Sequence, residues 1–88
     1  MYSLVLTPSF GRNLKKFLAK HQELERVVEE KLDNLSRNPA GPKLKLHKLT
    51  GEMSGSWAIS ISYGYRIVFA IESNSIVLLR IGTHDEVY

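Results

Sequence analysis

The chain has 88 residues, no cysteine and a formal net charge of +3 at pH 7. The length predicts a single domain, residues 1–88, and the lack of cysteine excludes disulfide frameworks, thiolate metal sites and cysteine nucleophiles. No run approaches the ~18 consecutive apolar residues of a membrane span, and the opening MYSLVLTPSF does not read as a secretion signal. We therefore expect a cytoplasmic protein that makes no contact with a membrane.

The charges are unevenly distributed along the chain. Five of the nine acidic residues fall within residues 23–33, and outside that window ten Lys or Arg face four Asp or Glu. Most of the molecule is therefore basic, which suits a polyanionic partner. An ordinary soluble surface with a chance cluster of acidic residues is the plainer interpretation.

The first half of the chain predicts a strand and a helical hairpin. Residues 2–7 alternate weakly, as in a short strand, and Thr7-Pro8-Ser9 is typical of a helix start. A turn is expected near residues 21–22, and the second helix should end before Asn38-Pro39. The apolar positions at helical spacing are Phe10, Leu14, Phe17 and Leu18, then Leu24, Val27, Val28, Leu32 and Leu35, with Lys31 on the second stripe.

The second half predicts strands. The Pro- and Gly-rich residues 39–55 indicate a loop, a short strand and another loop. Residues 57–62 alternate so that one face is buried, and Tyr63-Gly64 indicates a tight turn. Residues 65–71 and 76–81 are apolar on both faces, as in central strands. The order β-α-α-β-β-β-β predicts an α+β fold with a helical hairpin packed on a mostly antiparallel sheet.

Two arginines interrupt the apolar strands. An unpaired buried guanidinium is costly, so Arg66 and Arg80 must reach water, a carboxylate or an anionic ligand. A three-residue loop at residues 73–75 would pair Val68 with Arg80 and put both arginines on one face. A two-residue loop would put them on opposite faces, and the sequence leaves both registers open.

Several of these residues resemble the RelE/ParE superfamily of toxin–antitoxin toxins. The shared features are Leu49-x-Gly51, Trp57 after Gly55, Tyr65-Arg66-x-Val-Phe and a short tail after the last strand. The tail RIGTHDEVY is most similar to the YafQ-type branch, whose members are ribosome-dependent mRNA endonucleases. The resemblance covers essentially the whole chain and implies a RelE-like fold.

The resemblance also implies a set of site residues. Arg80, His84 and Tyr88 match catalytic residues of the YafQ-type branch, and His47 matches another histidine used there. Arg66 matches the arginine of the Tyr-Arg motif in the RelE branch. The sequence departs from the pattern at Ser60 and Gly64, where the YafQ-type branch carries a histidine and an acidic residue.

The implied reaction is attack of the RNA 2′-OH on the adjacent phosphate. It requires a base, an acid and cations around the phosphate, but no metal and no cofactor. His84 can act as acid or base, Arg80 can stabilise the phosphate charge, and Tyr88 can stack on a base. The residues expected to bind the RNA backbone are Lys43, Lys45, His47, Lys48 and Arg66.

Plainer interpretations exist for each part of this set. Lysines commonly blunt strand edges, His84 is typical of an exposed loop, and Tyr88 could dock the tail as a hydrophobic peg. Trp57 lies on the apolar side of its strand and is expected in the core. With three histidines and no cysteine, nothing in the sequence resembles a metal site.

The sequence leaves three functions open within the resemblance. The first is an mRNA endonuclease that acts on the ribosome and contacts ribosomal RNA. The second is a ParE-like toxin that inhibits DNA gyrase and cuts nothing. The third is a degenerate toxin without activity. All three imply a cognate antitoxin with an amphipathic segment that wraps the toxin and masks its basic face.

Overall fold

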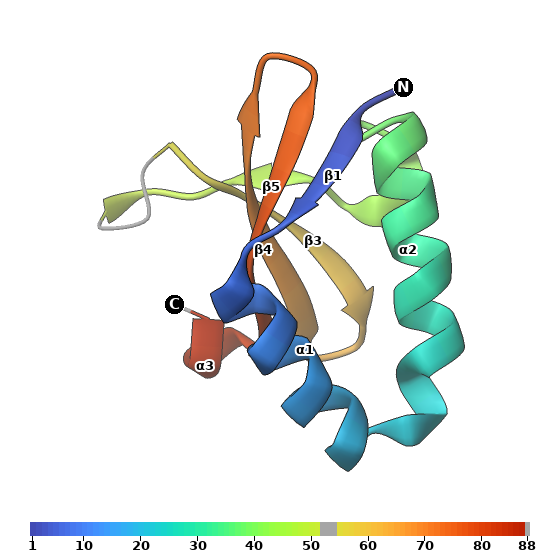
Figure 1. Cartoon of the computed structure of the whole chain (residues 1–88). Coiled ribbons are helices and arrows are strands. Elements are labelled where there is room, and N and C mark those ends of the chain that lie inside the picture. Colours follow the sequence, from blue (N-terminus) through green and yellow to red (C-terminus); the bar gives the residue numbers. More distant parts are fainter. Residues whose placement is uncertain (52–54, 88) are drawn as a thin grey trace.

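The computed structural model describes residues 1–51 and 55–87 and confirms the predicted α+β architecture (Figure 1). The elements in chain order are β1 (Ser3–Leu6), α1 (Pro8–Lys20), η1 (Gln22–Leu24), α2 (Glu25–Arg37), η2 (Pro42–Leu44), β2 (His47–Lys48), β3 (Trp57–Ser62), β4 (Tyr65–Glu72), β5 (Ser75–Thr83) and α3 (His84–Val87). Among the helices of the described residues, none has the length and apolar character to cross a membrane.

The helix boundaries follow the local signals in the sequence. Thr7 caps α1, because its Oγ1 accepts a hydrogen bond from the Phe10 amide at 3.1 Å and donates one to the Leu78 carbonyl at 3.0 Å. Pro8 occupies the first turn of α1, where its missing N–H costs nothing. The second helix ends at Arg37, just before Asn38-Pro39, as predicted.

The sheet has the strand order β1-β5-β4-β3-β2. All neighbours are antiparallel except β1, which runs parallel to β5. The two long helices cover one face of this sheet and form the main core with it. Its buried members are Phe10, Phe17, Val28, Leu35, Leu44, Ile59, Ile61, Ile67, Phe69, Ile76, Leu78 and Ile81.

A smaller cluster lies on the opposite face of the sheet. Leu49, Ala58, Val68 and Val87 are buried together, and Leu79 packs against them. The prediction that β3 has one buried face was therefore wrong at Ala58, whose small side chain is covered by this second cluster. The prediction that β4 and β5 are apolar on both faces is confirmed.

The β4–β5 hairpin combines both registers that the sequence left open. Its turn has two residues, because Glu72 pairs with Ser75, and Ser73 takes a positive φ of 53°. A β-bulge between Val68 and Phe69 then shifts the register, so that Val68 pairs with Arg80. The extra residue on β5 is Leu79. The bulge thus pairs Val68 with Arg80, which is the pairing that a three-residue loop would also give.

Candidate functional site

The sheet register places three of the predicted site residues on one face. His47 pairs with Ala58, Ala58 with Val68, and Val68 with Arg80, which forms a row across four strands. Directly paired residues point to the same side of a sheet, and Ala58 and Val68 lie in the second cluster. His47 and Arg80 therefore belong to the face that α1 and α2 leave uncovered.

Arg66 belongs to the same face. It lies two residues before Val68 and pairs with Ser60 on one side and Gly82 on the other. Because side chains alternate along a strand, Arg66 and Val68 point to the same side. His47 and Arg80 lie three strands apart, a backbone separation of roughly 14 Å at ~4.8 Å per strand. Arg66 lies on the strand next to that of Arg80.

A basic groove of about 600 Å³ opens beside β3 and gathers four of the five predicted RNA-binding residues. Its cationic and imidazole side chains are those of Lys31, Lys43, Lys45, His47 and Arg66. Residues 60–65, from the end of β3 through the turn into β4, form the remaining wall. Within the described part of the chain, the lining of this groove does not include Arg80, His84 or Lys48.

The loop that carries the lysines is held from two sides. Leu44 is buried in the main core, and Lys45 takes the left-handed conformation with φ 53° and ψ 49°, which reverses the chain before β2. The Nζ of Lys31 on α2 donates a hydrogen bond to the Lys43 carbonyl at 3.0 Å. Lys31 therefore fixes the loop and adds a charge to the groove. The sequence indicates only that Lys31 lies on the second helical stripe.

Arg66 and His47 are in contact inside the groove. The Arg66 Nη1 lies 3.4 Å from the His47 Nε2, and the His47 Nδ1 lies 3.2 Å from the Lys45 carbonyl oxygen. Among the described residues, the Nε of Arg66 is buried and has no hydrogen-bond acceptor. An unsatisfied buried donor costs about 1–3 kcal/mol. The buried Nε therefore makes Arg66 costly for the fold at this position.

Lys48 lies outside this groove. Its side chain points away from His47, as expected for neighbours in a strand, and its Nζ lies 5.9 Å from the centroid of the Trp57 ring. Trp57 packs against the main core, as its position in the strand predicted. Lys48 is thus engaged with an aromatic face rather than with the other predicted RNA-binding residues.

The predicted catalytic residues belong to the C-terminal end of the chain. Arg80 is exposed at the bulge in β5. His84 opens the short helix α3, its side chain is 59% exposed, and its Nδ1 lies 3.7 Å from an Asp85 carboxylate oxygen. Tyr88, the third predicted catalytic residue, lies outside the described residues.

A reciprocal pair of hydrogen bonds fixes α3, which the sequence analysis had not predicted. The Thr83 amide donates to the Glu86 Oε1 at 2.8 Å, and the Glu86 amide donates to the Thr83 Oγ1 at 3.3 Å. This is a capping box, and its Thr-x-x-Glu spacing is readable in the sequence. The hydrogen bonds from Thr83 lower the pKa of the Glu86 carboxyl. A Cβ at Gly82, near the end of β5, would lie 3.0 Å from the Glu86 Oε1, so a larger residue there would push against the capping side chain.

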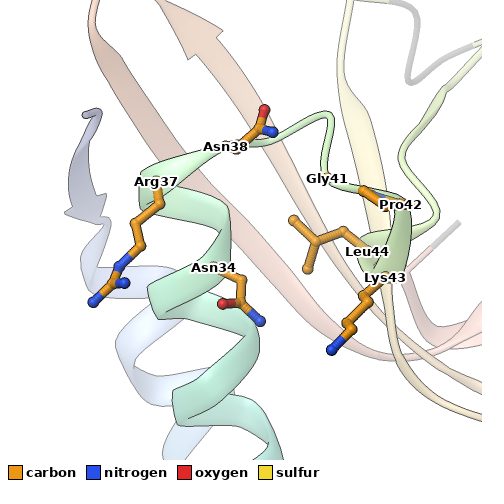
Figure 2. Close-up of a pocket in the computed structure, with 7 residues that line it drawn as sticks. All are labelled: Asn34, Arg37, Asn38, Gly41, Pro42, Lys43 and Leu44. Atoms are coloured by element: carbon orange, nitrogen blue, oxygen red, sulfur yellow. The ribbon is translucent and has the colours of Figure 1, made fainter.

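A second cavity of about 280 Å³ lies between the end of α2 and η2 (Figure 2). Leu44 points across it toward Asn34 on α2, and Arg37 also contributes to the lining. Lys43 lines both this cavity and the basic groove. No group of three His, Cys, Asp or Glu side chains in residues 1–51 and 55–87 gathers closely enough to hold a metal ion.

Solved structures define the class of protein to which this fold belongs. A copper-bound mutant toxin from Helicobacter pylori is 26% identical, with a TM-score of 0.84 and 100% of both chains covered. YafQ from E. coli is 14% identical, with a TM-score of 0.83, and the match covers 100% of this chain and 99% of YafQ. YoeB from a Staphylococcus aureus YoeB–YefM complex is 21% identical, with a TM-score of 0.76, covering 96% and 98%. The fold is that of the RelE/ParE superfamily of toxins.

The family model for YafQ, a bacterial toxin of type II toxin–antitoxin systems, matches residues 2–88. No curated protein sequence gives a significant match. Because the family model spans nearly the whole chain, the chain belongs to the YafQ family of type II toxins. The resemblance noted in the motifs and the C-terminal tail is thereby confirmed.

Proposed function

We propose that the protein is a metal-independent endoribonuclease that cleaves messenger RNA on the ribosome in the cytoplasm. The observation that carries the proposal is the shared sheet face of His47, Arg66 and Arg80, bordered by a groove with further lysines. A path lined by permanent positive charge suits a single-stranded polyanion. Membership of the YafQ family supports the same reading.

In the proposed reaction the substrate supplies its own nucleophile. The 2′-oxygen forms a bond to phosphorus while the bond from phosphorus to the 5′-oxygen breaks. The products are a 2′,3′-cyclic phosphate and a 5′-hydroxyl end. Arg80 stabilises the charge on the phosphate oxygens, since a guanidinium remains protonated and offers a fork of donors. His84 transfers the proton to or from the reacting oxygens, and Tyr88 stacks on a base beside the cleaved bond.

The groove holds the RNA to one side of that bond. Lys43, Lys45 and Arg66 contact phosphates, and His47 acts beside Arg66. Because His47 and Arg80 lie at opposite ends of a row of four strands, they contact different nucleotides of the bound strand. Ribosomal RNA completes the placement of the message.

A cognate antitoxin controls this activity in the proposal. Similar structures include YoeB–YefM toxin–antitoxin complexes. We expect an antitoxin segment with acidic residues to cover the groove, because the lysines and Arg66 present complementary charge. Covering the groove would exclude the message.

Brief expression in growing cells, followed by mapping of transcript ends, tests the proposal. The native chain should produce new ends within translated regions. Arg80→Ala and His84→Ala should each abolish most of those ends and relieve growth arrest. Since both side chains are exposed, the variants should fold and retain antitoxin binding.

The second candidate is a gyrase inhibitor of the ParE kind. It is favoured by Ser60 and Gly64, which line the groove where the YafQ-type branch carries a histidine and an acidic residue. Growth arrest with intact transcripts, together with inhibition of gyrase supercoiling, would support this candidate over the nuclease. The absence of any growth defect would indicate a degenerate toxin.

A further inference from the structure

Tyr63 stands out at the tip of the β3–β4 turn. The residue is 102% exposed, the highest exposure among the large hydrophobic residues that the structure describes. The other described aromatics have packing partners: Phe10, Phe17 and Phe69 are buried, and Tyr2, Trp57 and Tyr65 pack against the main core. A fully solvated phenol ring contributes no packing to the fold, so the ring is accessible to a ligand.

The turn itself does not require a tyrosine. Ser62 pairs with Tyr65, so Tyr63 and Gly64 make a two-residue connection, and Gly64 supplies the positive φ of 87°. Any residue with a side chain that tolerates solvent would satisfy the geometry at position 63. The exposed ring is therefore not a by-product of the turn.

The base of this turn is anchored. The Tyr65 ring lies edge-on to Phe17, with centroids 5.3 Å apart, and its centroid is 4.8 Å from that of His21. Tyr65 also pairs with Thr83, the residue just before α3. The tip that carries Tyr63 is thus held at the same end of the sheet as the C-terminal tail.

Tyr63 lines the same groove as Lys43, Lys45 and Arg66. We propose that Tyr63 is a stacking platform for one base of the single-stranded RNA whose phosphates these cations hold. The inference rests on the proposed RNA-cleaving function. It adds a residue that contacts a base, whereas the cations contact phosphates. Stacking accepts every base because each has a π-face, so Tyr63 strengthens binding without dictating the sequence cut.

Cleavage of a synthetic message on purified ribosomes tests the stacking role. Tyr63→Ala should raise the half-saturating toxin concentration about tenfold, the scale of one lost stack, with a much smaller change in the maximal rate. Tyr63→Phe should behave as the native chain, because it keeps the ring. Asn74→Ala, at the tip of the opposite β4–β5 turn, is the matched control and should change nothing.

Messages with a single abasic nucleotide, moved along the region around the cleaved bond, identify the stacked base. At one position the abasic message should require more native toxin, and there the difference between the native chain and Tyr63→Ala should vanish. If the native chain and Tyr63→Ala reach half-saturation at the same concentration on the intact message, the stacking role is wrong. The proposed nuclease function would not be affected by that result. A Tyr63→Ala defect that persists at every abasic position, or a defect of the same size in Tyr63→Phe, would overturn the stacking role too.

Two further outcomes distinguish failure of the stacking role from failure of the proposed RNA-cleaving function. If the native chain cuts no message, the proposed function fails and the stacking role fails with it. If Tyr63→Ala cuts normally but escapes neutralisation by the co-expressed antitoxin, the ring belongs to a protein interface and the RNA assignment is wrong.

Discussion

Arg66 combines a structural cost with a proposed functional use. Its Nη1 lies beside His47, while its Nε is a buried donor that no described residue accepts from. Stability alone would favour an apolar side chain of similar length at this position. In the proposed function this cost is offset because the guanidinium places a permanent positive charge in the groove that holds the RNA phosphates.

Arg66→Met should therefore separate stability from activity. We expect an unchanged or slightly higher free energy of unfolding, by up to about 1 kcal/mol, because the unsatisfied donor is removed. RNA cleavage should fall at least tenfold. Urea denaturation and the ribosome cleavage assay measure the two effects. Arg37→Met, which removes an exposed partner of Asp33, is the control and should alter neither quantity appreciably. Loss of stability in Arg66→Met would contradict this account.

Two glycines offer a matched pair of substitutions to alanine. At Gly82 the new Cβ would lie 3.0 Å from a Glu86 carboxylate oxygen and 3.2 Å from its Cβ. At Gly11, inside α1, it would meet nothing within 4 Å. Gly82→Ala should displace α3 and reduce cleavage, since His84 opens that helix. Gly11→Ala should raise stability by about 0.5–1 kcal/mol with normal cleavage. Thermal denaturation and cleavage assays distinguish the two variants. Normal cleavage by Gly82→Ala would show that activity does not depend on the close contact between Gly82 and Glu86.

At the scale of elements, α1 closes the open edge of β5. The Asn13 Oδ1 accepts a hydrogen bond at 2.7 Å from the Ile81 amide, beyond the stretch where β1 pairs with β5. An unpaired edge amide buried under a helix would be costly. One side chain on the helix thus replaces the missing strand partner next to Arg80.

Asn13→Ala should destabilise the fold by about 1–3 kcal/mol, because the Ile81 amide loses its acceptor. Asn13→Asp keeps an acceptor oxygen and should retain most of the stability. Urea denaturation of the two variants beside the native chain provides the comparison. Equal losses in both would indicate that the hydrogen bond is not the stabilising feature.

The capping box gives α3 a pH dependence of predictable sign. The pKa of Glu86 is lowered from 4.5 by the Thr83 hydrogen bonds, so its ionised form is favoured in the folded tail. The stabilising effect is therefore fully present above pH 4.5 and is lost as the pH falls through the lower folded pKa. The Thr83 amide chemical shift, followed by NMR, should titrate below 4.5. Glu86→Gln should abolish that titration; a native midpoint at or above the ordinary value would contradict the assignment.

The elements differ in how far the sequence predicts them. Periodicity was enough for α1, α2 and the strands from residue 57 onward, because their apolar stripes are long. Four residues are too few for periodicity to reveal α3, although its Thr83 and Glu86 spacing was a readable signal. The bulge at Leu79 could not be predicted, because the sequence does not fix the pairing register of the two strands. In the structure Leu79 packs against the smaller cluster.

The sequence predicted four of the residues that line the groove, but it did not predict how they are arranged. Loop residues Lys43 and Lys45 meet Arg66 only because the sheet order puts the short strand β2 at the edge next to β3. That order depends on long-range pairing, which a single sequence does not specify. The same pairing separates Lys48 from the groove, since alternate strand residues point to opposite faces. Lys31 was missed because its role comes from a contact with the loop.

At the scale of the whole molecule, the helix-covered face of the sheet carries the main core, and the opposite face carries the smaller cluster and the proposed site residues. The helices cover the main core, and the opposite face presents His47, Arg66 and Arg80 beside the basic groove. Binding of single-stranded RNA to such a surface releases counterions, so affinity should fall steeply with salt.

Two lysines test whether the groove is the binding path. With a non-cleavable single-stranded RNA, fluorescence anisotropy between about 50 and 200 mM salt gives the salt slope of binding. Lys43→Gln should weaken binding and reduce that slope by about 0.7, the loss of one phosphate contact. Lys48→Gln removes the same charge from outside the groove and should leave the slope unchanged. Equal effects of the two substitutions would argue against a defined path.

Cleavage by the substrate's own 2′-hydroxyl is the central chemical claim, and one substitution in the message tests it. A synthetic message on purified ribosomes should be cut by the native chain, leaving a 2′,3′-cyclic phosphate and a 5′-hydroxyl. The same message with a single 2′-deoxynucleotide on the 5′ side of the cut bond should remain intact at that bond. Cutting of the deoxy-substituted message at that bond, or no cutting of the all-ribose message, would contradict the account.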